Sequence, residues 1–187
     1  MSGLSFIIQY ITKPRTVGAI WPSSKYLAKK MIQDIDFESA EYIVEYGPGT
    51  GVFTDKILTA RHPSTVLMLI ENNQGFYDLL VKKYSDIPNL YIINGSAENV
   101  GEYMAQHSIP HADYVVSGLP FASLPQDVST RILAQTKTHL KQDGKFITFQ
   151  YTLLKKDFIA QHFNEISIRR ELRNIPPAYV LSCNNTV

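Results

Sequence analysis

Residues 42–51, YIVEYGPGTG, join a short apolar run to a loop that holds three glycines. The run predicts a buried strand, and the glycines predict a tight turn into a helix. Further apolar runs follow at 65–71, 89–93, 113–117 and 145–150. Stretches with helical spacing lie between them, near 52–60, 74–84, 97–105 and 126–140. A strand followed by a helix, repeated four times, indicates a parallel sheet with helices on both faces.

The C-terminal part of the chain departs from this alternation. A helix predicted near 155–162 precedes two extended segments at 165–172 and 178–183, which suit an antiparallel pair at one edge of the sheet. We therefore expect an α/β fold with a doubly wound, seven-stranded sheet that is mostly parallel and has an antiparallel C-terminal edge. One domain would span 1–187, with its core over 40–187.

The composition is that of an ordinary globular protein. The chain has 187 residues, of which 44% are hydrophobic and 19% are charged, and this excludes collagen-like and disordered classes. The single cysteine, Cys183, leaves no intramolecular disulfide and no thiolate cluster for zinc. His107 and His111 have the spacing of a helical metal pair, but Pro110 would break that helix. We expect no metal site.

Basic residues gather near the N-terminus. The net charge is only +1, yet residues 1–33 hold no Asp or Glu and five basic residues: Lys13, Arg15, Lys25, Lys29 and Lys30. Residues 1–35 therefore predict a helical, basic extension or lid, in which Ser23 or Ser24 caps a helix that runs to about residue 35. A solvated charged face is the alternative interpretation.

An apolar face precedes these charges. Leu4, Ile7, Ile8 and Ile11 would share one side of a helix, which is typical of segments that lie on anionic membranes. We expect reversible membrane binding through residues 4–30, unless this helix covers the sheet instead. The sequence shows neither a signal peptide nor an apolar run near the length of a spanning helix. It predicts a cytoplasmic protein, peripheral at the inner membrane face.

The loop after the first strand is the expected ligand site, because ligands of such sheets bind beyond the carboxyl ends of the strands. Its glycines depart from the dinucleotide fingerprint, whose last position is taken by Val52. Glu45 could pair with the ammonium of an adenosine ligand that carries an amino acid, while loop amides meet its carboxylate. The expected cofactor is S-adenosylmethionine, held here by Glu45, Gly47, Pro48, Gly49, Thr50 and Gly51.

Two further strand ends complete the predicted cofactor site. Glu71, followed by Asn72, stands where nucleotide-binding sheets place a carboxylate on the ribose hydroxyls. Ser96, Ala97 and Glu98 follow the third strand, where related sheets hold the adenine, and the side chain of Ser96 or Glu98 would bond its amino group. A plain helix N-cap by Ser96 is the alternative.

The fourth strand ends above the predicted methyl donor, and we expect the catalytic part of the site there, at Ser117, Gly118, Leu119, Pro120 and Phe121. Ser117 would also touch the cofactor. Pro120 forces an abrupt turn, and Phe121 would stack on the incoming amine or the sulfonium, or form a cation–π contact with it. A simple proline turn is the alternative.

These motifs carry a resemblance. The stretches IVEYGPGTGVFT (43–54), LIENN (69–73) and VSGLPF (116–121) resemble motifs I, post-I and IV of class I S-adenosylmethionine-dependent methyltransferases. They are similar in particular to ribosomal RNA adenine dimethylases and bacterial phospholipid N-methyltransferases. The stretches KPRTVGAIWPSSKYLAKKM (13–31) and NIPPAYV (174–180) resemble the second family. The resemblance implies a Rossmann-like fold and methylation of a phosphatidylethanolamine-type amine, with S-adenosylhomocysteine as the product.

Two departures from the dimethylases favour a lipid acceptor over nucleic acid. They carry Asn where this chain has Gly118, and they append a helical RNA-contacting domain for which too little chain follows residue 183. The expected acceptor pocket is formed by Trp21, Ser23, Ser24, Tyr26 and Phe121, although Trp21 could instead pack on the core. The remaining alternatives are an RNA adenine or other N-methyltransferase and a non-catalytic, membrane-associated protein that binds adenosylmethionine.

Overall fold

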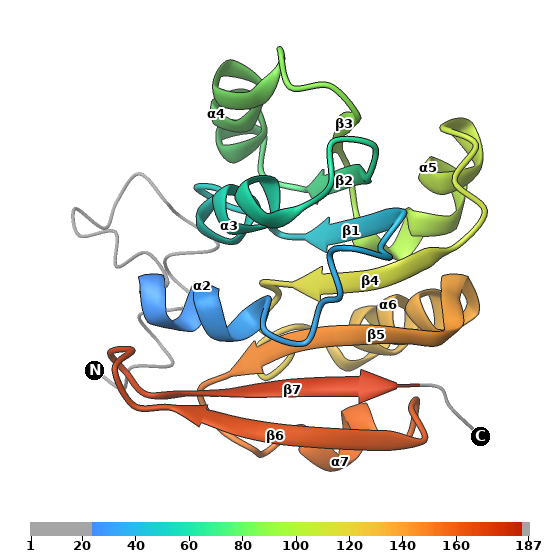
Figure 1. Cartoon of the computed structure of the whole chain (residues 1–187). Helices are drawn as coiled ribbons and strands as arrows, with labels where there is room; N and C mark the ends of the chain where they lie inside the picture. The colour runs from blue at the N-terminus through green and yellow to red at the C-terminus, as the bar shows by residue number, and fades with distance from the viewer. Residues whose placement is uncertain (1–23, 185–187) are drawn as a thin grey trace.

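The computed structural model describes residues 24–184 and contains a seven-stranded sheet of order β3-β2-β1-β4-β5-β7-β6 (Figure 1). The strands are β1 (Tyr42–Tyr46), β2 (Val66–Glu71), β3 (Leu90–Asn94), β4 (Ala112–Ser117), β5 (Leu140–Gln150), β6 (Glu165–Glu171) and β7 (Ala178–Asn184). Strands β1 to β5 pair in parallel, whereas β7 runs antiparallel to both β5 and β6. The predicted fold class is confirmed.

Helices cover both faces of the sheet (Figure 1). The helices of one face are α2 (Lys25–Met31), α3 (Val52–Ala60) and α4 (Gln74–Tyr84); those of the other are the 3-10 turn η1 (Ala97–Asn99), α5 (Val100–Gln106), α6 (Gln126–His139) and α7 (Lys156–Ala160). Successive strand residues point to opposite faces, so Ile43 joins one core and Val44 joins the other. Both faces of the parallel strands are therefore apolar.

Some boundaries differ from the sequence predictions. Strand β5 begins directly after α6, at Leu140 rather than near residue 145, because Leu140 pairs with Ala112 across an irregularity in the β4 register. Residues 141–143 are exposed, which hides this part of the strand from a hydrophobicity pattern. The helix predicted at 97–105 is divided into η1 and α5.

Helix α2 is part of the packed molecule. Ser24 caps it, since its hydroxyl accepts a hydrogen bond from the Leu27 N–H at 3.2 Å, and the helix ends at Met31 rather than near residue 35. Leu27, Ala28 and Met31 are fully buried. This part of the predicted N-terminal extension therefore belongs to the core. None of the helices within residues 24–184 is long and apolar enough to cross a bilayer.

Candidate active site

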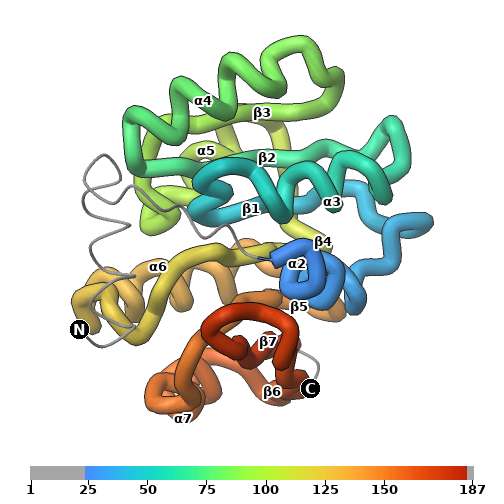
Figure 2. Tube along the Cα trace, turned by 90° about the vertical axis from the view of Figure 1, so that its left-hand side faces the viewer, coloured from blue at the N-terminus to red at the C-terminus, as the bar shows by residue number. Residues whose placement is uncertain are grey.

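The predicted site loops meet at one edge of the sheet, which faces the viewer in Figure 2. Tyr46 lies in register with Ile70 of β2 and Ser117 of β4. The pairing continues one residue further: the Gly47 N–H donates to the Ile70 carbonyl at 2.9 Å, and the Gly118 N–H donates to the Tyr46 carbonyl at 2.8 Å. The glycine loop and the catalytic segment predicted at 117–121 are therefore direct neighbours.

The glycine loop is open at its centre and supported at its end. Gly49 has a φ of +58°, and a Cβ atom there would meet nothing within 4 Å. Its backbone is therefore accessible to a ligand. Gly51 is the N-cap of α3, and the Tyr84 hydroxyl fills the space beside it while donating to the Gly51 carbonyl at 3.1 Å. A side chain at Gly49 would therefore project into the open space beside the loop.

Glu71 links the end of β2 to the glycine loop. Its carboxylate accepts hydrogen bonds from the Gly49 N–H at 3.0 Å and from the Asn73 N–H at 2.9 Å. The side chain is buried, and burial raises the pKa of Glu71 while the backbone donors act in the opposite direction. The predicted ribose-binding carboxylate thus lies at the loop, and Asn72 beside it is exposed.

Glu45 is fully buried beneath the same loop. Its Oε2 accepts a hydrogen bond from the Thr54 hydroxyl at 2.8 Å, whereas its Oε1 has no hydrogen-bond partner among the described residues. Burial raises the pKa of Glu45 to about 8, and the charge of Glu71 acts in the same direction.

The two carboxylates suit a cationic ligand. Within residues 24–184, no Lys or Arg forms an ion pair with Glu45 or Glu71. A buried carboxylate without a compensating charge is costly, and a cation bound beside it removes that cost. S-adenosylmethionine carries an ammonium and a sulfonium, so the residues present fit this cofactor.

The segment predicted to hold the adenine is already engaged in local contacts. Ser96 caps η1: its hydroxyl accepts the Glu98 N–H at 3.3 Å and donates to the Glu98 carboxylate at 2.9 Å. Arg131 approaches the same carboxylate at 2.5 Å and holds the pKa of Glu98 below its usual value. Ala97 is buried. The cap is thus present in the structure, and adenine recognition by Ser96 or Glu98 stays a prediction.

Strand β5 fixes the turn that follows β4. The buried Ser117 hydroxyl accepts the Leu119 N–H at 3.2 Å, and the Thr148 hydroxyl donates to the Ser117 carbonyl at 3.3 Å. The Gln150 amide accepts the Ala122 N–H at 3.3 Å and donates to the Leu119 carbonyl at 3.4 Å. The backbone around Pro120 is therefore held in place from the neighbouring strand.

The position of Phe121 requires a correction to the expected aromatic contact. The Phe121 N–H donates to the Leu119 carbonyl at 3.1 Å, and the side chain enters the apolar layer below the turn. It is fully buried, and its ring meets Phe146 edge-on with the ring centroids 6.0 Å apart. In this position the ring presents no face to a ligand, so we do not retain it as a substrate contact.

The expected acceptor pocket is described only in part. Trp21 and Ser23 lie outside the described residues, as do residues 4–23 of the predicted membrane segment. Ser24 caps α2 and Tyr26 belongs to it, where the centre of the Tyr26 ring lies 4.3 Å from the guanidinium of Arg173. These two residues therefore pack on the turn between β6 and β7, and their part in an acceptor pocket stays a prediction.

Two positioning residues, Thr54 and Gln150, are not among those predicted from the sequence. Thr54 donates a hydrogen bond to the Glu45 carboxylate. The sequence feature that could have indicated this role is a polar residue on the buried side of α3, between the apolar Phe53 and Ile57. Gln150 holds the turn after β4 although it lies at the end of β5. Its role could not be predicted, because the sequence pattern does not show that Gln150 contacts Ala122, which lies 28 residues earlier in the chain.

Comparison with known proteins agrees with this geometry, and it places the chain among the S-adenosylmethionine-dependent methyltransferases with a Rossmann-like fold. Within that class, the model of the ribosomal RNA adenine dimethylase family matches residues 18–172. The chain belongs to this family.

Individual relatives are similar to different extents. An ornithine lipid N-methyltransferase from Singulisphaera acidiphila is 29% identical over 180 residues, which cover 95% of this chain and 93% of that protein. A ribosomal RNA small subunit methyltransferase A from Sulfurihydrogenibium sp. is 31% identical over 50% of this chain, but the match spans only 35% of that protein. The solved precorrin-6y C5,15-methyltransferase from Geobacter metallireducens shares the fold, with a TM-score of 0.67 at 12% identity over 91% of this chain and 94% of that one.

Proposed function

We propose that this enzyme transfers a methyl group from S-adenosylmethionine to the amine of a membrane lipid, of the phosphatidylethanolamine or ornithine lipid type. The ornithine lipid N-methyltransferase supports this acceptor class because its similarity extends over nearly the whole of both chains. The similarity to the RNA methyltransferase, by contrast, covers about half of this chain.

Gly118 is the observation that carries the proposal. A Cβ atom at this position would lie 2.6 Å from the Gly47 carbonyl oxygen, so the loop leaves no room for a side chain. Those members of the family that methylate RNA adenine carry Asn here, and its side chain accepts a hydrogen bond from the adenine amino group. The lone pair of that aromatic amine is delocalised into the ring and needs such help. A neutral alkyl amine has a localised lone pair and does not.

The proposed reaction is a direct displacement. The nitrogen–carbon bond forms as the sulfur–carbon bond breaks, and the nitrogen loses one proton. When bound, the cofactor supplies an activated methyl group. The protein contributes alignment and the exclusion of water. Glu45 and Glu71 would hold the cofactor, and the backbone of 117–120 would form the wall beside the incoming amine.

The acceptor amine must be neutral before it attacks. A primary alkyl ammonium has a pKa of roughly 10, as lysine does, so deprotonation precedes methyl transfer. The proposed contacts for the departing proton are the Ser117 hydroxyl and the Gly118 carbonyl, with water as the final acceptor. The Ser117 carbonyl is engaged by Thr148, and the Leu119 carbonyl by Phe121.

Transfer of a labelled methyl group tests this function. The wild-type protein is incubated with labelled cofactor and, separately, with phosphatidylethanolamine micelles, ornithine lipid micelles and ribosomal RNA. We expect label in a lipid and none in RNA. Gly49→Val serves as the negative control, because a branched side chain would strain the backbone at its φ of +58° and occupy the open space beside the loop. Methylated adenine with unmodified lipid would reverse the assignment in favour of the RNA alternative, which the family match supports.

A non-catalytic role has its own signature in the same assay. Calorimetry with S-adenosylmethionine and S-adenosylhomocysteine accompanies the transfer reactions. If neither lipid nor ribosomal RNA is methylated although both adenosyl ligands bind, the chain is a cofactor-binding protein without turnover. Affinity for both ligands weaker than about 1 mM, or about −4 kcal/mol, would instead contradict the cofactor site itself.

A further inference from the structure

The turn between β6 and β7, residues 172–177, exposes large apolar side chains. Leu172 is 64% exposed and Ile175 is 67% exposed, and Pro176 and Pro177 beside them are exposed as well. The turn is firmly held, because the buried Asn174 accepts the Ser24 N–H at 3.0 Å and donates to the Pro176 carbonyl at 2.7 Å. These side chains are therefore presented to solvent by a fixed backbone.

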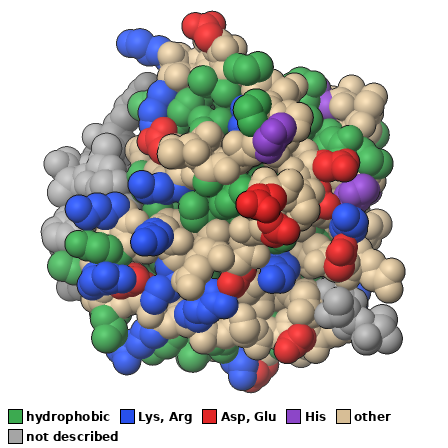
Figure 3. Space-filling view, in the orientation of Figure 1, with side chains coloured by type: hydrophobic (Ala, Val, Ile, Leu, Met, Phe, Trp, Pro, Cys, Tyr) green, Lys and Arg blue, Asp and Glu red, His purple; other side chains and the backbone are tan. Residues whose placement is uncertain are grey.

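Basic side chains surround this apolar tip. Lys25 and Lys29 of α2 are exposed, as are Arg170 and Arg173 of the β6–β7 hairpin. The acidic residue between the two arginines, Glu171, is 2% exposed and has its charge matched by Arg173 at 3.0 Å and Lys30 at 3.3 Å. In Figure 3, Lys and Arg side chains alternate with hydrophobic ones at the lower left, over α2 and this turn.

A second loop at the same end of the sheet has the same character. Gln150, the last residue of β5, pairs with Tyr179, which in turn pairs with Arg170. The segment after β5 therefore leaves the sheet at the end where the β6–β7 turn lies. Leu154 in this segment is 83% exposed, and the basic Lys155 and Lys156 follow it.

This end of the sheet is also the end that holds the candidate active site. The strands β1, β4, β5 and β6 all run toward it, and the glycine loop, the turn after β4 and the β6–β7 turn face the viewer together in Figure 2. A planar partner that met the β6–β7 turn would lie against the edge at which the methyl acceptor must enter.

We infer that the β6–β7 turn and the exposed lysines of α2 dock the protein on the surface of an anionic lipid bilayer. Apolar side chains on a rigid turn can enter the lipid interface, while the surrounding cations meet anionic headgroups. The inference rests on the proposed function, because docking would bring the active-site edge of the sheet to a lipid acceptor. Its lysines lie within the segment 4–30 predicted from the sequence, whereas the β6–β7 turn is a membrane contact that the sequence did not predict.

Vesicle co-sedimentation without cofactor tests the surface. The full chain is mixed with phosphatidylcholine vesicles, with or without phosphatidylglycerol. Binding should require the anionic lipid and weaken as salt screens the charges. Leu172→Asp with Ile175→Asp should reduce binding at least tenfold, and Lys25→Glu with Lys29→Glu should reduce it by at least about fivefold per site. Leu79→Asp and Lys82→Glu, on the exposed side of α4, are the matched controls and should bind as the wild type does.

A labelling experiment keeps the inference testable if a charged variant fails to fold. Cys183 is the single cysteine of the chain and is buried, so an environment-sensitive dye can be attached at Ile175→Cys alone. Anionic vesicles should shift its emission to the blue, while the same dye at Leu79→Cys should not respond. An unchanged spectrum at Ile175→Cys would overturn the inference.

The other outcomes separate the surface from the enzyme. Loss of vesicle binding in the two docking variants, in a protein that methylates no lipid, would support the surface and contradict the proposed acceptor. Full binding by both variants would overturn the surface even if lipid were methylated. Weaker binding of the variants to ribosomal RNA, with vesicle binding unchanged, would reassign the patch to nucleic acid.

Discussion

Gly118, at the end of β4, lies so close to the Gly47 carbonyl, at the end of β1, that position 118 has no room for a side chain. A Cβ atom built on Gly118 would lie 2.6 Å from the Gly47 carbonyl oxygen and 3.5 Å from that of Tyr46. The contact joins the glycine loop to the turn after β4. The shapes of the glycine loop and of the turn after β4 therefore both depend on this one pair of residues.

Gly118→Ala should therefore damage both activity and stability. The added methyl group must displace backbone, which we expect to cost about 1–3 kcal/mol of unfolding free energy and at least tenfold in methyl transfer. Urea denaturation and the labelled-methyl assay measure the two effects. Gly75→Ala in α4 is the matched control, because its Cβ would meet only the Asn73 side chain at 3.4 Å. Equal behaviour of the two variants would contradict the close approach.

The raised pKa of Glu45 predicts an unusual pH dependence for the cofactor-free protein. The folded protein holds this proton up to a pH of about 8, whereas the unfolded chain releases it near 4.5. The unfolding free energy should therefore fall between those values, by up to a few kcal/mol. Glu45→Gln should lose this slope, while Glu38→Gln at an exposed position should keep it. Parallel stability profiles for wild type and Glu45→Gln would show that the carboxylate titrates normally.

Thr54→Val tests the positioning of Glu45 without touching the ligand-binding backbone. Loss of the hydroxyl donor removes the hydrogen bond to a buried carboxylate, a loss of about 1.5–3 kcal/mol. We expect cofactor affinity to fall roughly tenfold and its pH optimum to move upward, which a purely structural role for Thr54 would not cause. Thr59→Val is the control, since its hydroxyl bonds only the Asp55 carbonyl on the exposed side of α3. Calorimetry at several pH values makes the comparison.

Glu71→Ala should weaken cofactor binding more than it weakens the fold. The carboxylate bonds the Gly49 N–H and is the predicted ribose acceptor, so its loss removes two functions at the ligand. We expect at least a tenfold loss of affinity for S-adenosylmethionine and S-adenosylhomocysteine alike, because both carry the same ribose. Unchanged affinity would place the ribose elsewhere. Glu41→Ala, at an exposed position just before β1, provides the control.

The contacts of Glu171 with Lys30 of α2 and with Arg173 of the β6–β7 turn should stabilise the fold in a pH-dependent way. Hydrogen bonds from Arg173, together with the Lys30 contact, lower the pKa of Glu171 to about 2. The contact stabilises the fold above the ordinary carboxylate pKa and is lost as pH falls toward 2. Glu171→Gln should cost about 1–2 kcal/mol at neutral pH and nothing in strong acid. The exposed Glu165→Gln, on the same strand, should leave thermal unfolding unchanged.

The fold could be predicted because buried parallel strands are continuous apolar runs. YIVEY and VLMLIE have this pattern, and both lie in the sheet where expected. The start of β5 could not be predicted, since Lys141, Gln142 and Asp143 are exposed and only the pairing of Leu140 with Ala112 extends the strand. The polar residues around this position therefore gave no indication that Leu140 pairs with Ala112.

The site was predictable to the extent that topology alone places it. Parallel strands bring Glu45, Glu71 and Gly118 to one edge whatever the packing details, and the chain order reveals them. The direction of the Phe121 ring depends instead on the turn that precedes it and on the space beside Phe146. Tertiary packing determines this direction, so the sequence of residues 117–121 is compatible with a Phe121 ring in the site or in the core.

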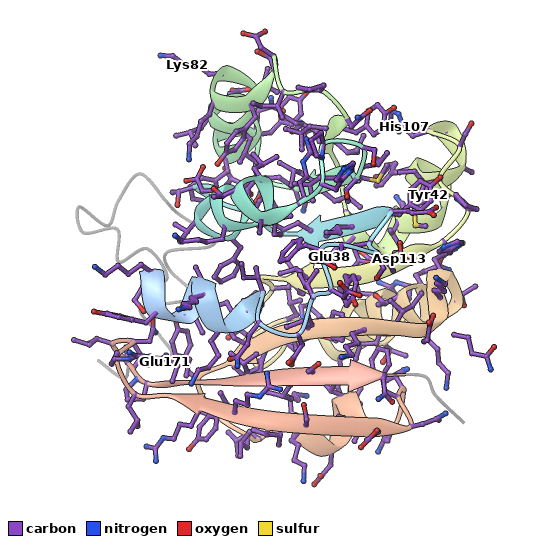
Figure 4. The ribbon with its side chains drawn as sticks, viewed as in Figure 1. Glu38, Tyr42, Lys82, His107, Asp113 and Glu171 are labelled. Atoms are coloured by element: carbon purple, nitrogen blue, oxygen red, sulfur yellow. The ribbon has the colours of Figure 1, made fainter. Side chains whose placement is uncertain are left out.

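The reversed direction of β7 separates two ends of the molecule. Because β7 runs antiparallel to β5, it starts beside the active-site edge and its last residue, Asn184, pairs with Lys145 at the far end of the sheet (Figure 1). Asp113, near the start of β4, and Glu171, beside the β6–β7 turn, mark these opposite ends in Figure 4. If the β6–β7 turn docks on a bilayer as proposed, a fluorescent protein fused behind β7 would project into the aqueous phase. Imaging and surface immobilisation could use that end without obstructing substrate entry.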